Sequence, residues 1–272
     1  MSNNLQRILT AVVAAPVFLF LAYMGGWPFA GLLGAIGLVG QMELYHMART
    51  TGATPHRIGG LVLGALVMAS LARPVLWPLA AVWLVGFIVV APFLLPQKQF
   101  LTSFTVTLAG AVYPTGLLGS LVLLRRAHPS TDASETAFWL VVLTILLVWA
   151  TDIFAYYVGK ALGRTPLAPT ISPNKTWEGT LGGLAAAGIV AVAMKLVMLE
   201  GLSWPHVGVL TLLGGGVSQI GDLMESQLKR STGAKDASTI LPGHGGVLDR
   251  FDAMLVAAPL VYLYLRTVAG LI

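Results

Sequence analysis

Long apolar stretches alternate with short polar connectors along nearly the whole chain, and this pattern sets the fold class. Most of the stretches are close to the roughly 17–25 residues that cross a bilayer as a helix. The third and fourth are separated only by Arg73-Pro74. The sequence therefore predicts an all-α polytopic integral membrane protein with about nine transmembrane helices, at residues 8–24, 29–47, 58–72, 78–95, 102–124, 137–159, 176–199, 206–228 and 247–270.

Composition supports this class and excludes others. Hydrophobic residues make up 56% of the 272 residues and charged residues 10%, whereas about a quarter of the residues in a soluble domain are charged. The chain has no cysteine, which excludes disulfides, thiolate metal sites and cysteine catalysis. The net charge is +5, but no long basic run exists to follow a nucleic acid backbone. The basic residues are expected to set membrane orientation and to contact anionic lipid or nucleotide.

The distribution of basic residues predicts the orientation of the chain. The first stretch could be a signal peptide, but eight more stretches follow, which favours a retained helix. With nine spans, the side of the N-terminus receives eleven basic residues: Arg7, Arg49, Arg57, Lys98, Lys160, Arg164, Lys175, Lys229, Arg230, Lys235 and Arg250. The other side receives Arg73, Arg125, Arg126 and Arg266. We therefore expect an inner-membrane protein with a cytoplasmic N-terminus, an external C-terminus, and cytoplasmic connectors at 160–175 and 229–246.

Acidic residues are concentrated in the second half of the chain. Before about residue 135 the apolar stretches contain Glu43 but almost no other acid, and Glu43 and His46 are interpreted as polar packing. Later come Asp152, Glu178, Asp222, Glu225, Asp236, Asp249 and Asp252. An acid in a membrane span is a functional candidate by default. We expect one membrane-embedded unit, with N-terminal helices at 1–135 and the catalytic site in the helices of 136–272.

Three of the expected helices bring acids to one depth. At 1.5 Å rise per residue, Asp222 lies roughly 10 Å below the cytoplasmic end of its helix. Asp152 lies at a similar depth, and Asp249 and Asp252 fall in the first turns of the last helix. Within the helices, Asp222 and Ser226 are four residues apart, and Asp152 shares a face with Tyr156 and Lys160. This arrangement predicts an acidic site just beneath the cytoplasmic surface.

Two interpretations of these acids are open. They could be structural ion pairs with Lys229, Arg230 and Arg250. Alternatively, carboxylates without thiols or clustered histidines suit a hard cation such as Mg²⁺. Mg²⁺ held by one or two carboxylates, with water and phosphate completing its shell, is typical of phosphoryl-transfer sites. We predict that Asp222 and Asp249 bind the metal.

The segment Ser172 to Gly179, "SPNKTWEG", predicts a helix start at the same surface. Ser172 is interpreted as the N-cap and Pro173 as the first helical residue. The free N–H groups of such a start, beside Lys175, would suit phosphate. An ordinary capped helix start is the alternative. The nearby "GHGG" supplies loose backbone around His244, which on its own is typical of a turn.

The segment "SQLKRSTGAKDASTILPGHGGVLDRFD" resembles the signature of the phosphatidate cytidylyltransferases, or CDP-diacylglycerol synthases, which runs S-x-x-K-R-x4-K-D-x5-P-G-H-G-G-x-x-D-R-x-D. The match extends without departure over 27 positions, from Ser226 to Asp252. The upstream block from Asp152 to Gly179 is also similar to the family's other polar block. The N-terminal half resembles the family only as a set of hydrophobic spans.

This resemblance implies an activity: CTP and phosphatidate would give CDP-diacylglycerol and diphosphate in phospholipid biosynthesis. It also implies a homodimer, and Mg²⁺ with a monovalent cation such as K⁺ as a second metal. With the acids described above, it indicates catalytic roles for Asp222, Asp249, Lys229, Arg230, Lys235, Asp236, His244 and Asp252. Residues expected to bind CTP or phosphate are Asp152, Tyr156, Ser172, Asn174, Lys175, Thr176, Glu178, Ser226, Gly245, Gly246 and Arg250.

Two rival functions are weighed against this one. A CTP-dependent polyprenol or dolichol kinase would use the same nucleotide, but it would need a base for the lipid hydroxyl. A transporter or channel could use the acids as a binding site, but such sites lie near the membrane midplane, often between repeated halves. The acids here lie near one surface, and no halves match. The sequence therefore favours the cytidylyltransferase.

Overall fold

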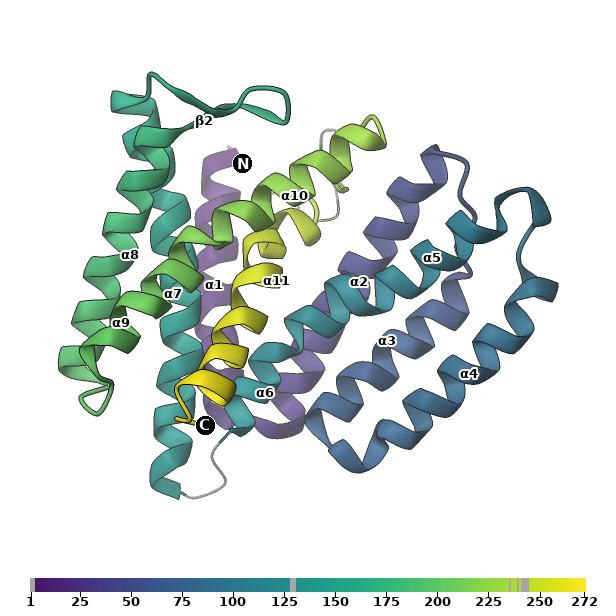
Figure 1. Cartoon of the computed structure of the whole chain (residues 1–272), viewed down its shortest axis with the longest axis horizontal. Coiled ribbons are helices and arrows are strands. Elements are labelled where there is room, and N and C mark those ends of the chain that lie inside the picture. The colour runs from purple at the N-terminus through teal and green to yellow at the C-terminus, as the bar shows by residue number, and fades with distance from the viewer. Residues whose placement is uncertain (1–2, 128–130, 235, 239, 241–244) are drawn as a thin grey trace. The chain divides into compact units, whose positions relative to one another are not determined.

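Helices account for most of this computed structural model, which describes residues 3–127, 131–234, 236–238, 240 and 245–272 (Figure 1). The chain forms two compact units. Unit 1 comprises Met1–Leu123 and Lys229–Phe251, and unit 2 comprises Leu124–Leu228 and Asp252–Ile272. The predicted division of the helices near residue 135 stays a prediction.

Unit 1 begins with a series of apolar helices. In chain order they are α1 (Asn3–Met24), α2 (Gly26–Thr50), α3 (Arg57–Ala72), η1 (Pro74–Leu76), α4 (Trp77–Leu94), η2 (Gln97–Gln99), α5 (Phe100–Gly110), the π-turn η3 (Ala111–Gly116) and α6 (Ser120–Arg126), whose last residues belong to unit 2. Pro114 lies inside η3. Because proline has no N–H for the α-helical ladder, a π-turn at this position is an expected adjustment.

A chain of hydrogen bonds joins two buried polar side chains of α2 to the backbone of α5. Gln41 Nε2 donates to the Tyr45 hydroxyl at 2.6 Å, and that hydroxyl donates to the Thr107 carbonyl at 2.6 Å. A Cβ added at Gly110 would lie 2.4 Å from the Tyr45 ring, so only glycine leaves room for this ring. These contacts tie α2 to α5 and satisfy the buried Tyr45 hydroxyl.

Unit 2 contains the long helices α7 (Thr131–Leu162) and α8 (Trp177–Val197), which Figure 1 shows side by side. Glycines let them approach closely: a Cβ at Gly183 would lie 2.6 Å from the Thr151 carbonyl oxygen. This confirms the close packing expected of small residues in membrane helices. The unit continues with α9 (Trp204–Thr211), the π-turn η4 (Leu212–Gly216), α10 (Ser218–Ser231), α11 (Leu248–Leu263) and the π-turn η5 (Tyr264–Val268); α10 and α11 also have residues in unit 1.

The segment around Ser172 corrects the sequence prediction. Ser172 is not an N-cap: Ser172–Thr176 forms strand β2, antiparallel to β1 (Pro166–Ala168), and the helix begins later. Thr176 caps α8 by accepting a hydrogen bond from Gly179 N at 3.2 Å. Proline tolerates the edge of a two-stranded ribbon, where its missing N–H costs no ladder bond. The local cap signal at Ser172 was therefore overridden by strand pairing, and Lys175 still directly precedes the capped helix start.

Among the described residues, six helical segments are long and apolar enough to cross a membrane by length and composition. They are Pro74–Leu94, Gln97–Arg126, Glu135–Leu162, Trp177–Val197, Trp204–Ser231 and Leu248–Val268. Each predicted span overlaps a helix, but α3 has only 16 residues, fewer than the roughly 17–25 that a span needs. The presence of nine transmembrane helices therefore stays a prediction.

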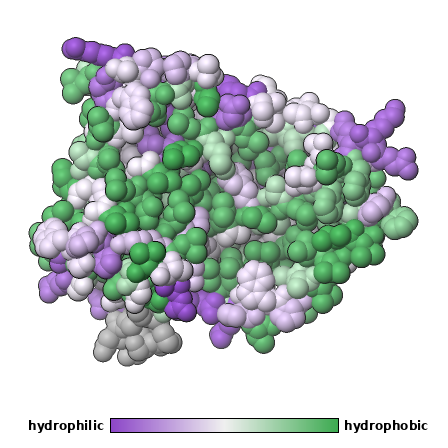
Figure 2. Space-filling model, viewed as in Figure 1, coloured by the Kyte–Doolittle hydropathy of each residue, from purple (hydrophilic) through white to green (hydrophobic). Residues whose placement is uncertain are grey.

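The surface of the helices matches a lipid environment. Large apolar side chains are exposed, among them Phe93 at 86%, Val75 at 81% and Ile189 at 72%. Figure 2 shows hydrophobic residues over wide areas of the visible face, with hydrophilic residues gathered toward its edges. Apolar exposure on this scale indicates contact with membrane or partner rather than with water. Together with the apolar helices, it identifies an integral membrane protein.

Candidate functional site

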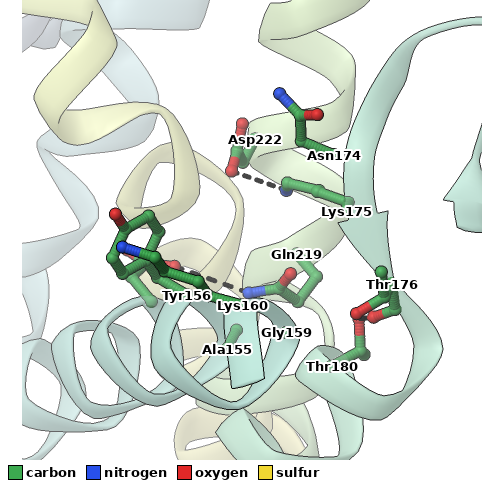
Figure 3. A pocket seen from close by; sticks show the side chains of 11 residues that line it. Ala155, Tyr156, Gly159, Lys160, Asn174, Lys175, Thr176, Thr180, Gln219 and Asp222 are labelled. Carbon is green, nitrogen blue, oxygen red and sulfur yellow. Dashed lines mark hydrogen bonds and ion pairs between the residues drawn. The ribbon is translucent and has the colours of Figure 1, made fainter. Parts of the chain in front are cut away.

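A cavity of about 470 Å³ in unit 2 brings several of the predicted site residues together (Figure 3). Ligand sites typically enclose roughly 300–1,000 Å³. The cavity is lined by Asp152, Ala155, Tyr156, Gly159 and Lys160 of α7, Asn174, Lys175 and Thr176 of β2, Thr180 of α8, and Gln219 and Asp222 of α10. We call it the Asp222 pocket. It combines carboxylate, amide and ammonium groups in a largely apolar unit.

Two carboxylates face this pocket from different helices. Gln219 Nε2 lies 3.5 Å from Asp152 Oδ1, and Ser226 Oγ lies 3.4 Å from Asp222 Oδ1. Asp152 and Asp222 are near enough for their negative charges to interact, and both interact electrostatically with Asp252. The predicted gathering of acids is thus confirmed for these three residues of unit 2. Their mutual repulsion favours a cation beside them.

Lys175 supplies the cation in the structure. Its Nζ lies 2.5 Å from Asp222 Oδ2, with 18% of the lysine side chain and 34% of the aspartate side chain exposed. Nζ is itself buried and has no other acceptor among the described residues. An ammonium has three donors, so Lys175 keeps donors for the oxygens of a ligand in the pocket. Its position just before the capped start of α8 adds the positive end of that helix.

Further polar groups complete the pocket wall. Lys160 Nζ lies 5.9 Å from the centre of the Tyr156 ring, a cation–π contact. The predicted shared face of Asp152, Tyr156 and Lys160 is confirmed, because all three line the pocket. Lys160, Thr180 and Gln219 were not predicted as site residues. The signal for Gln219 was present: it is a polar residue one helical turn before Asp222.

The donor set of the pocket fits a hard divalent cation. Asp152 and Asp222 offer carboxylate oxygens and Gln219 an amide oxygen, whereas thiol and imidazole ligands are missing from this wall. Among the residues that the structure describes, no three acids or histidines are arranged to hold a metal by themselves. Mg²⁺ characteristically takes one or two carboxylates and leaves the rest of its shell to water and phosphate. The residues present therefore suit Mg²⁺ that is bound together with a phosphate ligand.

Other predicted residues of unit 2 lie outside the pocket lining: Ser172, Glu178, Ser226 and Asp252. Glu178 accepts hydrogen bonds from Arg164 N at 3.1 Å and from Thr165 Oγ1 at 2.8 Å, and so holds the turn after α7. Asp252 is buried and hydrogen-bonds to the side chain of the fully buried Glu225. This contact supports the packing of α10 against α11 within unit 2.

Unit 1 contains Asp249, the second predicted metal ligand, in a cluster of polar groups. Lys229 Nζ donates to Asp249 Oδ1 at 2.6 Å, and both side chains are well buried, at 14% and 8% exposed. Asp249 Oδ2 accepts from Ala237 N at 2.9 Å and from Gly246 N at 2.8 Å. This carboxylate therefore fastens the connector to the start of α11.

The remaining residues of the predicted set are distributed around the connector. Arg230, Asp236 and Arg250 are exposed. Gly245 has φ +80°, a conformation that favours glycine. Two predicted catalytic residues, Lys235 and His244, lie outside the described residues.

Comparison with known proteins supplies the family. Residues 5–268 match the model of the cytidylyltransferase family. The phosphatidate cytidylyltransferase of Brucella abortus is 39% identical over 268 residues, covering 97% of this chain and 94% of the relative. Those of Bacillus subtilis and Synechocystis are each 34% identical; the matches cover 96% and 95% of this chain and 97% and 95% of those proteins. The matches run through both units, including the Asp222 pocket and the connector, and the chain belongs to the cytidylyltransferase family.

Proposed function

We propose that this protein is a phosphatidate cytidylyltransferase, a nucleotidyltransferase that converts CTP and phosphatidate into CDP-diacylglycerol and diphosphate. Its relatives with this activity match nearly the whole chain. The structural observation that carries the proposal is the Asp222 pocket, where a buried ammonium with spare donors lies beside two carboxylates. Such a pocket suits a nucleoside triphosphate with its metal ion.

The reaction needs no nucleophilic side chain. An oxygen of the phosphatidate phosphomonoester attacks the α-phosphorus of CTP, the bond from that phosphorus to the bridging oxygen breaks, and diphosphate leaves. The attacking oxygen is already anionic, so no base has to remove a proton. The protein's work is to hold two polyanions together and to offset their repulsion.

Lys175 is proposed to hold the phosphates of CTP. Its buried Nζ has donors left over beside Asp222, and the capped start of α8 is adjacent. Lys160 lines the same pocket and adds a second positive charge. Asn174 and Thr176 supply neutral donors and acceptors that orient the nucleotide.

Mg²⁺ is proposed as the cofactor, with K⁺ as a second cation. When bound, Mg²⁺ screens the phosphate charges and stabilises the diphosphate leaving group. Asp222 and Asp249 are the proposed ligands: both are carboxylates, which Mg²⁺ prefers, and Asp222 is 34% exposed in its pocket. Asp152 is proposed to orient ligands at the rim of the Asp222 pocket.

The membrane arrangement is also a proposal. We infer nine spans in the inner membrane, a cytoplasmic site and a homodimer. The charge asymmetry supports the orientation. A reporter that is active only in the cytoplasm should be silent when fused after Ile272 and active when placed in the 229–246 connector. A C-terminal fusion that reports from the cytoplasm would contradict the nine-span topology.

The activity is tested with purified protein in detergent, CTP labelled in its α-phosphate, Mg²⁺ and phosphatidate. We expect labelled CDP-diacylglycerol and an equal amount of diphosphate. Omitting phosphatidate is the matched control and should abolish diphosphate release. A second set of assays offers polyprenol and CTP labelled in its γ-phosphate. Transfer of that label to the alcohol would identify a lipid kinase instead, and no turnover with either lipid would contradict both activities.

A further inference from the structure

Glu43 of α2 is a buried acid that reaches the signature connector. It is only 2% exposed. Its Oε1 accepts from Ser238 Oγ at 2.5 Å and from Val247 N at 2.9 Å, and its Oε2 accepts from Leu248 N at 2.7 Å. All of these residues belong to unit 1. The carboxylate thus caps the first turn of α11 from a helix some 200 residues away, and a buried charge with three donors is well satisfied.

Glu43 and Asp249 hold neighbouring residues of the same connector. Ala237 N donates to Asp249, and the next residue, Ser238, donates to Glu43. Gly246 N donates to Asp249, and the next residue, Val247, donates to Glu43. The middle of the connector, at 237–238, and its C-terminal end, at 246–247, are therefore held by the same two carboxylates. A shift of one carboxylate moves the donors of the other.

The last glycine of "GHGG", Gly246, is explained by the same contact. A Cβ added at Gly246 would lie 2.9 Å from both carboxylate oxygens of Glu43 and 2.9 Å from Ala237 Cβ. Any side chain at this position would push Glu43 away from Val247 and Leu248. The glycine is needed here for space, because it lets the acid approach the backbone.

We propose that Glu43 is a positioning residue for the cytidylyl transfer: it sets the connector and the first turn of α11, and thereby the orientation of Asp249. This inference rests on the proposed function of Asp249. The hydrogen bonds of Glu43 go to the connector and to the first turn of α11, so it acts through the connector. Supporting residues of this kind typically change metal affinity or activity by about 10–100-fold when they are removed.

The test compares Glu43→Gln with Tyr45→Phe. Glutamine has the shape of glutamate, but one of its two terminal atoms is a donor, so at least one of the three donors facing it loses its acceptor. Tyr45→Phe is the matched control. It also removes a buried polar contact of α2, but that contact ties the helix to Thr107 and not to the connector. Ser238→Ala is a milder third variant: it removes one of the three donors to Glu43 and the acceptor of Ile240 N.

Three quantities are measured on folded, detergent-purified protein: kcat, the Mg²⁺ concentration for half-maximal activity, and hydrogen exchange of the peptide covering 245–252. For Glu43→Gln we expect kcat to fall and the Mg²⁺ requirement to rise by about tenfold or more, with faster exchange at Val247 and Leu248. Ser238→Ala should show the same changes to a smaller extent. Tyr45→Phe should lower thermal stability alone.

Two results would overturn the proposal. If Glu43→Gln speeds exchange but leaves kcat and the Mg²⁺ requirement within twofold of wild type, Glu43 only stabilises the fold. If exchange at Val247 and Leu248 is unchanged, the contact does not fix the connector. Failure of the proposed function is separable, because wild-type protein would then lack turnover while the exchange comparison still reports on the contact.

Discussion

Two lysine–aspartate pairs, one in each unit, have nearly the same length but different surroundings. Lys175 and Asp222 are 2.5 Å apart in unit 2, and Lys229 and Asp249 are 2.6 Å apart in unit 1. Asp249 is 8% exposed and accepts two backbone N–H groups besides the lysine. Asp222 is 34% exposed, and among the described residues its other hydrogen-bond partner is the distant hydroxyl of Ser226.

The difference shows that the surroundings of an ion pair, more than its length, decide what it can do. Asp249 contributes to the stability of the fold, since two backbone N–H groups would be buried without an acceptor if it were removed. Asp222 contributes little to the stability of the fold and lines a cavity, so its charge is available to a ligand. We therefore expect different effects on turnover and on stability when each acid is replaced by asparagine, which keeps the shape and removes the charge.

The largest effect is expected for Asp222→Asn. Turnover should fall roughly 10³-fold, because the metal site loses charge that offsets several kcal/mol in the transition state. The thermal midpoint should stay close to wild type, since few contacts are lost. Labelled CTP turnover and a melting curve in detergent measure the two effects. Raised Mg²⁺ should restore part of the activity. Normal turnover at limiting Mg²⁺ would show that the metal lies elsewhere.

Asp249→Asn should lose both turnover and stability. We expect an activity loss of about 10²-fold or more and a loss of about 3 kcal/mol in the free energy of unfolding, because Lys229 and two backbone N–H groups share a weaker acceptor. Denaturant titration compares this variant with Asp222→Asn. Equal stability of the two variants would erase the distinction between the pairs.

Lys175→Ala should raise the KM for CTP by about 10–100-fold, the equivalent of a charge-assisted hydrogen bond of roughly 1.5–3 kcal/mol. Lys175→Arg should keep part of this affinity, although its planar fork does not replace an ammonium fully. Steady-state kinetics with varied CTP provide the measurement. An unchanged KM in Lys175→Ala would reduce the start of α8 to an ordinary capped helix.

The smallest effect is expected for Ser226→Ala. The 3.4 Å contact between Ser226 Oγ and Asp222 is long, so it should contribute only about 0.5 kcal/mol, or less than threefold in kcat/KM. Ser226 belongs to the predicted binding residues, yet it lies outside the pocket lining. A loss as large as that of Lys175→Ala would mean that the serine contacts substrate.

Much of the site could be predicted from sequence because its signals are local. A charged residue in an apolar stretch stands out against its neighbours, and helical spacing then places Asp152, Tyr156 and Lys160 on one face. The structure confirms that face at the Asp222 pocket. Gln219 carried the same kind of signal and was overlooked, since a neutral amide is less conspicuous than an acid.

By itself, the sequence determined the helical membrane class and the residues of the signature, because hydropathy and motif spacing are properties of consecutive residues. Only the tertiary structure decided which groups meet. Ser172 carries a local cap signal, but pairing with the segment Pro166–Ala168 makes it part of a strand and moves the cap to Thr176. Glu43 stood out as an acid in an apolar stretch and was interpreted as polar packing, but no local signal indicated its partners Ser238, Val247 and Leu248, which are distant in sequence. Long-range contacts of this kind depend on how the helices pack, and no short stretch of sequence contains that information.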